Sequence, residues 1–234
     1  MCLNPIYVHA TLSTKGGIIM EYILSKFSHE LRNPLTTVYS TIQLIEMQHP
    51  EVKEYKYWSN LSEDLEYMNA LLSQLSDYAK SETLQLETFS LEDLLKQISL
   101  SFAASIATSK VEYTSKITPS LSQITGDKIK LQEVFLNLLK NAFDAASPDK
   151  TIFLEATSDK DFITITIHDT GCGIPKEQLP TIFEPFVTYK KNGSGLGLTI
   201  CHNIIKSHGG TITVDSIENA KYIFNNMIDN IKQL

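Results

Sequence analysis

Two long stripes of apolar residues at helical spacing limit the folds open to this chain of 234 residues more than any other feature. Apolar side chains recur in steps of three and four from about Ile19 to Met47 and again from Val52 to Tyr78, which predicts two amphipathic helices. The His-Pro-Glu segment at 49–51 breaks the pattern and predicts a short turn, so the two helices form a hairpin. Such a hairpin cannot bury its apolar residues alone, and the pattern therefore predicts a homodimer with a four-helix bundle.

The chain after Ser81 mixes short strands and helices without a strict strand–helix–strand repeat, which predicts an α+β fold with a two-layer α/β sandwich. Ser90 and Asp127 are predicted to cap helices over 91–105 and 128–146, because their side-chain oxygens can accept from first-turn N–H groups. The other predicted elements are a helix over 196–207 and strands over 111–117, 121–124, 151–156, 162–168 and 211–214.

Charge and cysteine content argue against several classes of function. Twenty basic and 27 acidic residues give a formal net charge of −7 without a basic stripe, so we expect no nucleic-acid partner. Cys2, Cys172 and Cys201 are too scattered for a disulfide framework or a zinc site, which favours a reducing compartment. No apolar run reaches the roughly 18 residues that span a bilayer. We therefore expect no membrane segment, and either a cytoplasmic chain or the cytoplasmic portion of a longer membrane protein.

The first candidate for chemistry is His29, which lies between Phe27 and Leu31 and so points away from the apolar stripe. A neutral imidazole has a free lone pair that can accept a phosphoryl group, and the adjacent Glu30 can hold the other ring proton. Pro34 is disfavoured inside a helix, and its position close to His29 suggests a functional constraint. A lone histidine on an exposed face is more often simply solvated, so this cluster alone leaves both interpretations open.

Asn137 and Asn141 form a second candidate site on the predicted helix over 128–146. Their side chains lie one helical turn apart on the same face. Amide oxygens are suitable ligands for Mg²⁺, which also keeps water and phosphate oxygens in its shell. This pair could bring a metal ion to a nucleotide, although the signal is weak by itself.

Two glycine-rich runs have side chains and backbone suited to a nucleotide. Asp169 follows a predicted strand, and its carboxylate can accept a hydrogen bond from an exocyclic amine such as that of adenine. Gly171 and Gly173 let the backbone approach a flat ring closely. The run Gly-Ser-Gly-Leu-Gly at 193–197 opens a helix, where backbone N–H groups can bind phosphates. The run lacks the preceding strand of a dinucleotide fingerprint.

In this order the clusters resemble those of the sensor histidine kinases of two-component systems, whose ATP-binding domain is of the GHKL type. The resemblance covers roughly residues 20 to 215. The Asn-Ala-Phe-Asp-Ala run at 141–145 is closer to the sporulation and nitrogen-regulatory kinases than to branches with Lys at position 144. The matching positions are His29 in the phosphoacceptor box, Asn137 and Asn141 in the N box, Asp169, Gly171 and Gly173 in the first glycine box, Phe183 to Phe186 in the lid, and Gly193, Gly195 and Gly197 in the second glycine box.

This resemblance implies three parts: an N-terminal extension over 1–18, a dimerisation and histidine phosphotransfer domain over 19–83, and a catalytic ATP-binding domain over 84–234. It implies that His29 attacks the γ-phosphoryl group of ATP with Glu30 as base. The phosphoryl group then passes to an aspartate in the receiver domain of a response regulator. Asn33 matches a position that in many relatives helps water to remove that phosphate, so phosphatase activity is a further expectation.

The resemblance also implies the ligands of the nucleotide. Asn141, together with Asn137, would hold Mg²⁺. The adenine amine would bind Asp169 beside the first glycine box. The phosphates would lie along the second glycine box, formed by Gly193, Gly195, Leu196 and Gly197.

Two departures from the family pattern leave a second hypothesis open. Only about twenty residues precede the hairpin, so the input domain lies on a partner or the chain is part of a longer protein. Lys221 and Tyr222 stand where relatives carry Gly and Thr before a Phe, here Phe224. We expect this change to weaken nucleotide binding or to displace the last strand. The alternative to an active kinase is thus a non-catalytic phosphotransfer or scaffold protein that has lost the use of ATP.

Overall fold

The computed structural model describes residues 14–119, 121, 123–146, 149–159, 162–190, 193–216 and 224–232, with backbone alone for 14–23, 29 and 224–232. The chain divides after Lys80 into two compact units. None of the helices in the described part of the chain is both long enough and apolar enough to cross a membrane.

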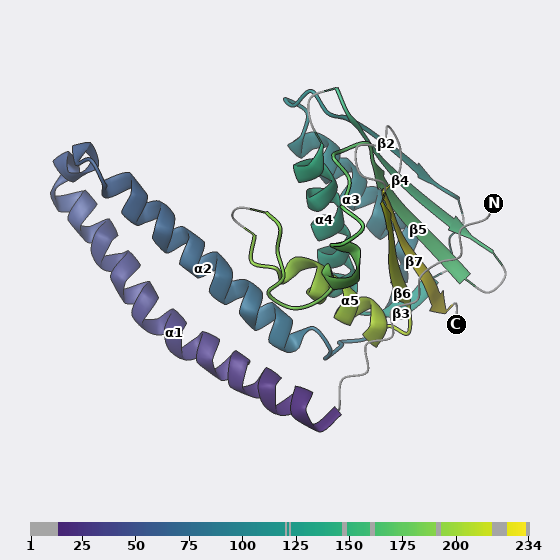
Figure 1. The fold of residues 1–234 in the computed structure, drawn as a ribbon, viewed down its shortest axis with the longest axis horizontal. Helices are drawn as coiled ribbons and strands as arrows, with labels where there is room; N and C mark the ends of the chain where they lie inside the picture. The colour runs from purple at the N-terminus through teal and green to yellow at the C-terminus, as the bar shows by residue number, and fades with distance from the viewer. Residues whose placement is uncertain are drawn as a thin grey trace. The chain divides into compact units, whose positions relative to one another are not determined.

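The first unit is the predicted helical hairpin, formed by α1 (Thr14–Gln48), the short 3₁₀ helix η1 (Pro50–Glu54) and α2 (Trp58–Lys80) (Figure 1). The helix α1 begins five residues before the predicted Ile19. The predicted start of the second helix at Val52 is wrong, because Pro50 turns the chain into η1 and α2 begins only at Trp58. Val52 continues the apolar spacing of the sequence although it lies in η1, because its side chain is buried there.

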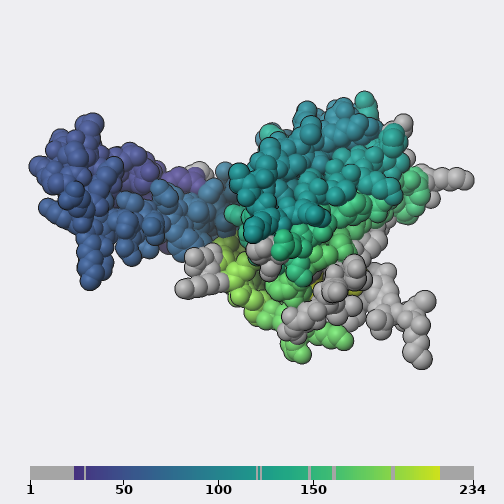
Figure 2. All heavy atoms as spheres, turned by 90° about the horizontal axis from the view of Figure 1, so that it is seen from above, coloured from purple at the N-terminus to yellow at the C-terminus, as the bar shows by residue number. Residues whose placement is uncertain are grey.

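Only part of each apolar stripe is buried within the hairpin. Its core consists of Leu35, Ile42, Leu65 and Leu72, with Tyr39 and Trp58 packed against them. The hairpin is a narrow unit in the space-filling view (purple to blue in Figure 2), and many apolar side chains therefore remain on its surface. The exposed apolar side chains include Phe27, Leu31, Val38, Leu44, Met47, Leu61, Tyr67 and Met68.

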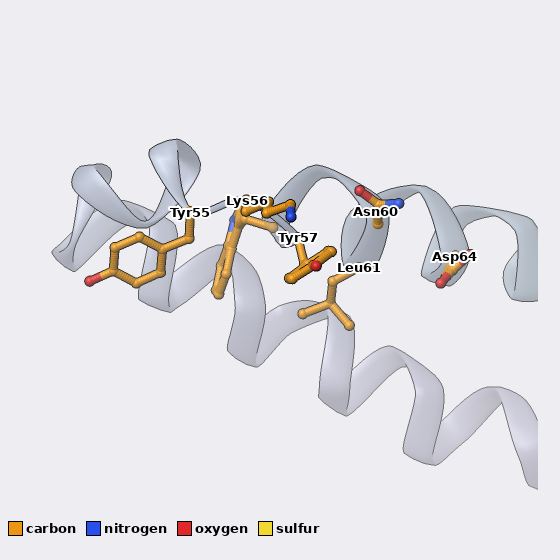
Figure 3. A pocket seen from close by; sticks show the side chains of 7 residues that line it. Tyr55, Lys56, Tyr57, Asn60, Leu61 and Asp64 are labelled. Carbon is orange, nitrogen blue, oxygen red and sulfur yellow. The ribbon is translucent and has the colours of Figure 1, made fainter.

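A shallow hollow of about 520 Å³ lies at the turn of the hairpin, around the start of α2. Figure 3 shows Tyr57 and Leu61 on the side that faces α1, whereas Asn60 points to the opposite side. The indole N–H of Trp58 donates a 2.8 Å hydrogen bond to Glu46 of α1, which ties the start of α2 to the end of α1.

The second unit is an α/β two-layer sandwich, as predicted. Its five-stranded sheet has the order β2-β4-β5-β7-β6, in which β2 and β4 are parallel and the other neighbours antiparallel. A separate pair of strands, β1 and β3, is antiparallel. Figure 1 shows the helices α3, α4 and α5 on one face of the sheet. The bounds are β1 Glu87–Ser90, α3 Leu91–Ser105, β2 Glu112–Ile117, β3 Gln123–Gly126, α4 Lys128–Ala145, β4 Thr151–Ser158, β5 Phe162–Asp169, η2 Leu179–Thr181, α5 Gly197–Ser207, β6 Thr211–Ser216 and β7 Phe224–Lys232.

The core of this unit lies between α4 and the neighbouring strands β4 and β5. Alternate residues of each strand are buried, as expected for a sheet with helices on one face. The strands contribute Ile152, Leu154, Ile163 and Ile165, and α4 contributes Leu131, Phe135, Leu138 and Leu139, all with fully buried side chains.

Local signals located the caps of the helices correctly. The hydroxyl of Ser90 accepts from the N–H of Asp93 at 3.1 Å, and the Asp127 carboxylate accepts from the N–H of Lys130 at 3.0 Å. The helix predicted from residue 196 begins at Gly197, with Leu196 as its N-cap residue. The strand predicted over 121–124 lies instead at 123–126, as β3, because it pairs there with β1. The sequence pattern did not predict β1.

The last strand, β7, does not lie at the edge of the sheet. It lies between β5 and β6, with Phe224 opposite Ser216. The residues of β7 carry little strand signal of their own, because Asn and Asp are poor strand formers, and its place depends on pairing with two neighbours. Lys221 and Tyr222 lie outside the described residues, so their predicted effect on nucleotide binding stays a prediction.

Candidate functional site

The first part of the candidate site lies where β5 ends against α4. Asp169 closes β5 with its side chain buried, and its carboxylate accepts a 2.8 Å hydrogen bond from the N–H of Gly171. Burial raises the pKa of this carboxyl, and the hydrogen bond from Gly171 opposes that shift. The carboxylate is therefore fixed in direction and largely shielded from water.

Gly171 is required by the space around it. A Cβ atom at this position would lie 2.5 Å from the carbonyl oxygen of Ala145 and 2.6 Å from the Asp169 carboxylate. The N–H of Cys172 donates to the same carbonyl at 3.3 Å. The first glycine box is thus held against the last residue of α4, one helical turn beyond Asn141.

The second part of the site is the face of α4 that carries Asn137 and Asn141, both half-buried. The amide oxygen of Asn141 accepts a 2.9 Å hydrogen bond from the ammonium group of Lys190. The same ammonium group forms a 2.9 Å ion pair with Asp144. A cation is therefore bound where the sequence predicted a metal ligand.

The third part is the second glycine box at the start of α5. Gly195 has a φ of +72°, and a Cβ atom there would lie 2.5 Å from the carbonyl carbon of Phe186, so glycine is required. A Cβ atom at Gly197 would meet nothing within 4 Å. The helix α5 begins at Gly197 without a side-chain cap, which leaves N–H groups of its first turn suited to an anion.

The lid, defined here as residues 183–190, precedes the second glycine box. The Phe183 ring lies 5.5 Å from the imidazole of His202 on α5. The hydroxyl groups of Thr181 and Tyr189 are 2.9 Å apart. The N–H of Phe186 donates to the carbonyl of Gly195 at 3.1 Å, so the lid is fixed at its base.

The phosphoacceptor box lies on α1, in the first unit. The backbone of His29 is helical, whereas its side chain lies outside the described residues. Its neighbour Ser28 is fully buried, and the Ser28 hydroxyl donates to the carbonyl of Leu24 at 2.7 Å. Glu30 and Asn33 are both exposed. The helix continues through Pro34, which has no N–H to offer the carbonyl of Glu30.

The structure brings together the residues predicted for nucleotide and metal but leaves His29, Glu30 and Asn33 on the other unit. Sequence reasoning missed Asp144, although its spacing of three from Asn141 places it on the same helical face. The structure places the ammonium group of Lys190 on Asn141 and Asp144.

Two family models match the chain. Residues 20–84 match the His Kinase A (phospho-acceptor) domain. Residues 126–230 match the model described as histidine kinase-, DNA gyrase B- and HSP90-like ATPase.

The curated relatives are kinases. The chain is 32% identical over 206 residues to sporulation kinase C of Bacillus subtilis (strain 168). This alignment covers 87% of this chain and 47% of that protein. It is 33% identical over 210 residues to the sensor histidine kinase ZraS of Salmonella typhimurium (strain LT2), and this alignment covers 88% of this chain and 45% of that protein. The chain thus spans less than half the length of these relatives.

Solved structures share the fold of this chain. Full-length ShkA, crystallised in complex with AMPPNP, superposes with a TM-score of 0.73 over 89% of this chain and 44% of that chain. At 23% identity this likeness shows the fold alone. The histidine kinase ThkA in complex with the response regulator protein TrrA gives a TM-score of 0.62 at 25% identity, over 90% of this chain and 62% of that chain.

Proposed function

The chain belongs to the sensor histidine kinases of two-component systems, and from this membership we propose that it transfers the γ-phosphoryl group of ATP to its own His29. The phosphoryl group then passes to an aspartate in the receiver domain of a response regulator. Both steps are proposals for this chain, since it covers less than half the length of the curated relatives.

The observation that carries the proposal is that the first glycine box and the lid both contact the end of α4. The lid is bonded in turn to the second glycine box, since the N–H of Phe186 donates to the carbonyl of Gly195. Gly171 lies against Ala145, and Lys190 reaches Asn141 and Asp144. A buried acceptor, a cation-binding face and an uncapped helix start are the three features that an adenine, a metal ion and a phosphate chain require.

The donor set fits ATP and Mg²⁺. Asp169 would accept from the adenine amine, and the backbone around Gly195 and Gly197 would hold the phosphates. Asn141 and Asn137 would hold Mg²⁺, and the Lys190 ammonium bound to Asn141 supports this assignment because it shows that the oxygen accepts a cation. The metal ion would neutralise charge on the phosphate groups, which is the main electrostatic requirement of phosphoryl transfer.

His29 would act as the nucleophile through a neutral imidazole nitrogen. One ring nitrogen forms the bond to phosphorus while the bond to the ADP oxygen breaks, and the exposed Glu30 orients or removes the proton on the other ring nitrogen. Asn33, exposed one turn further along α1, would position water for removal of phosphate from the regulator. Kinase and phosphatase activity would therefore use the same face of α1.

The exposed apolar side chains of the hairpin support the proposed homodimer. Phe27, Leu31 and Val38 recur at helical spacing on α1, and Leu61 and Met68 do so on α2. A second copy of the hairpin would cover these side chains in a four-helix bundle. The receiver domain of the regulator is the proposed second partner, since its aspartate must reach His29.

Incubation of the full chain with Mg²⁺ and ATP labelled at the γ-phosphate tests the proposal. We expect label that is stable in base and lost in acid, as phosphohistidine is. Asn141→Ala should lose the label because the metal ligand is gone, yet it should still accept phosphate back from a phosphorylated regulator. Asn60→Ala, at an exposed asparagine of the hairpin turn, is the matched control. A wild-type chain that takes phosphate from the regulator but never from ATP would favour the non-catalytic alternative instead.

A further inference from the structure

Lys190 is held at the C-terminal end of α4 by three attractions. Its ammonium group lies 2.9 Å from the amide oxygen of Asn141 and 2.9 Å from the carboxylate of Asp144. Both acceptors stand among the last five residues of α4, three residues apart and therefore on one face. The C-terminal end of a helix also carries partial negative charge, which favours a cation there.

The backbone that carries Lys190 is itself ordered. The N–H of Phe186 donates to the carbonyl of Gly195 at 3.1 Å, and the N–H of Val187 donates to the carbonyl of Glu184 at 3.4 Å. The N–H of Lys190 donates to the hydroxyl of Thr188 at 3.2 Å. The contact with α4 is thus made by a defined segment of the lid.

The amide oxygen that holds Lys190 is the oxygen that the proposed function assigns to Mg²⁺. An ammonium group and a divalent cation on one oxygen would repel each other, so the two cations compete for Asn141. We propose that Lys190 and Asp144 form a latch, in which Asp144 is a positioning residue that keeps Lys190 on Asn141 until the metal and nucleotide replace it. The consequence for nucleotide binding rests on the proposed function.

The latch is weak enough to be opened by a ligand. The side chains of Lys190 and Asp144 are 49% and 40% exposed. Exposed ion pairs change an equilibrium by about two- to five-fold, and salt screens them. The latch would therefore adjust nucleotide affinity by a few-fold and would weaken at high ionic strength.

Amide hydrogen exchange of the full chain without nucleotide tests the latch directly. Asp144→Asn and Lys190→Gln should each speed exchange at Phe186, Val187 and Lys190 by about two- to five-fold. The double variant should exchange no faster than Lys190→Gln alone, because Lys190→Gln already removes the contacts of the ammonium group with both Asp144 and Asn141. Asp215→Asn, which removes an exposed carboxylate from β6, is the control and should match the wild type. Unchanged exchange in Asp144→Asn, or effects that multiply in the double variant, would overturn the latch.

Calorimetric titration with Mg²⁺ and a non-hydrolysable ATP analogue tests the consequence. Asp144→Asn should bind the analogue about two- to five-fold more tightly, with a smaller gain in a Lys190→Gln background. Weaker binding by Asp144→Asn would contradict the latch, because Asp144 would then support the metal. A chain that binds no nucleotide would refute the proposed function, and the exchange experiment would still decide whether the latch exists.

Discussion

His208, at the end of α5, shows how a single imidazole joins two elements of the second unit. Its Nε2 accepts from the backbone N–H of Asp127 at 2.8 Å, and its Nδ1 lies 2.7 Å from the carbonyl oxygen of Ile204. This arrangement requires the neutral tautomer with hydrogen on Nδ1. A Cβ atom at Gly126 would lie 2.9 Å from the imidazole ring, so Gly126 makes room for it.

The neutral state of His208 predicts a pH dependence of stability. Burial lowers the pKa of His208 from its ordinary value of 6.5, so the unfolded chain binds this proton more readily than the folded one. The contribution of neutral His208 to the free energy of unfolding is fully present above about pH 6.5. It is lost as the pH falls from there through the lowered pKa of the folded state. His208→Phe should remove this dependence and cost about 1–3 kcal/mol at pH 8, since the Asp127 N–H loses its acceptor.

Urea unfolding of the wild type and of His208→Phe between pH 5 and pH 8 measures how the protonation of His208 changes the free energy of unfolding. The loss of stability below pH 6.5 should be steeper in the wild type than in His208→Phe. Parallel curves would show that His208 does not couple folding to protonation.

Residues of the site could be predicted from sequence where local chemistry requires them, and could not be predicted where a long-range contact decides their partners. Asp169 and the glycines were predicted because a buried acceptor and a close backbone approach need particular residue types. The partners of Lys190 were not, because the contact joins segments 46 and 49 residues apart in sequence.

Among the elements, the turn of the hairpin depends on a side-chain clamp. Glu46 accepts from the indole N–H of Trp58 at 2.8 Å and lies 3.5 Å from the ammonium group of Lys53. The hydrogen bond from Trp58, followed by the charge of Lys53, holds the pKa of Glu46 below its ordinary value. The clamp therefore weakens as the pH falls and Glu46 takes up a proton.

Trp58 is the one tryptophan of the chain, so its fluorescence reports on this clamp. Glu46→Ala should move the fluorescence transition in urea to a lower concentration, because Trp58 and Lys53 both lose a partner. Glu54→Ala, which removes an exposed carboxylate from the same turn, should leave the transition near that of the wild type. Equal shifts in the two variants would mean that the clamp adds nothing beyond its charge.

Elements were predictable from sequence where their signals were local. Ser90 and Asp127 cap their helices as predicted because each bond spans only three residues. The start of α2 was wrong because Val52 continues the apolar spacing while belonging to η1. The bounds and place of β7 could not be predicted from local signals, because they come from pairing with β5 and β6.

For the whole molecule, the exposed apolar side chains of the hairpin predict a homodimer. Val38, which is 46% exposed on α1, should lie in the dimer interface, where burial contributes about 25 cal/mol per Å². Val38→Glu would place a charge there and should convert the dimer to a monomer at micromolar concentration. Thr36→Glu adds the same charge at an exposed polar position of α1 and should remain dimeric.

Light scattering of the full chain distinguishes these states. A wild-type monomer at micromolar concentration would contradict the homodimer. A Val38→Glu variant that stays dimeric would show that the interface uses another face of the hairpin.

The central claim, that His29 receives the phosphoryl group of ATP, is tested most directly by locating the label. After incubation with Mg²⁺ and γ-labelled ATP, the wild-type chain should carry acid-labile, base-stable phosphate at His29, and His29→Gln should carry none. His49→Gln is the matched control, because His49 is an exposed histidine of the same hairpin and should not affect labelling. Label that persists in His29→Gln, or that disappears in His49→Gln, would contradict the assignment.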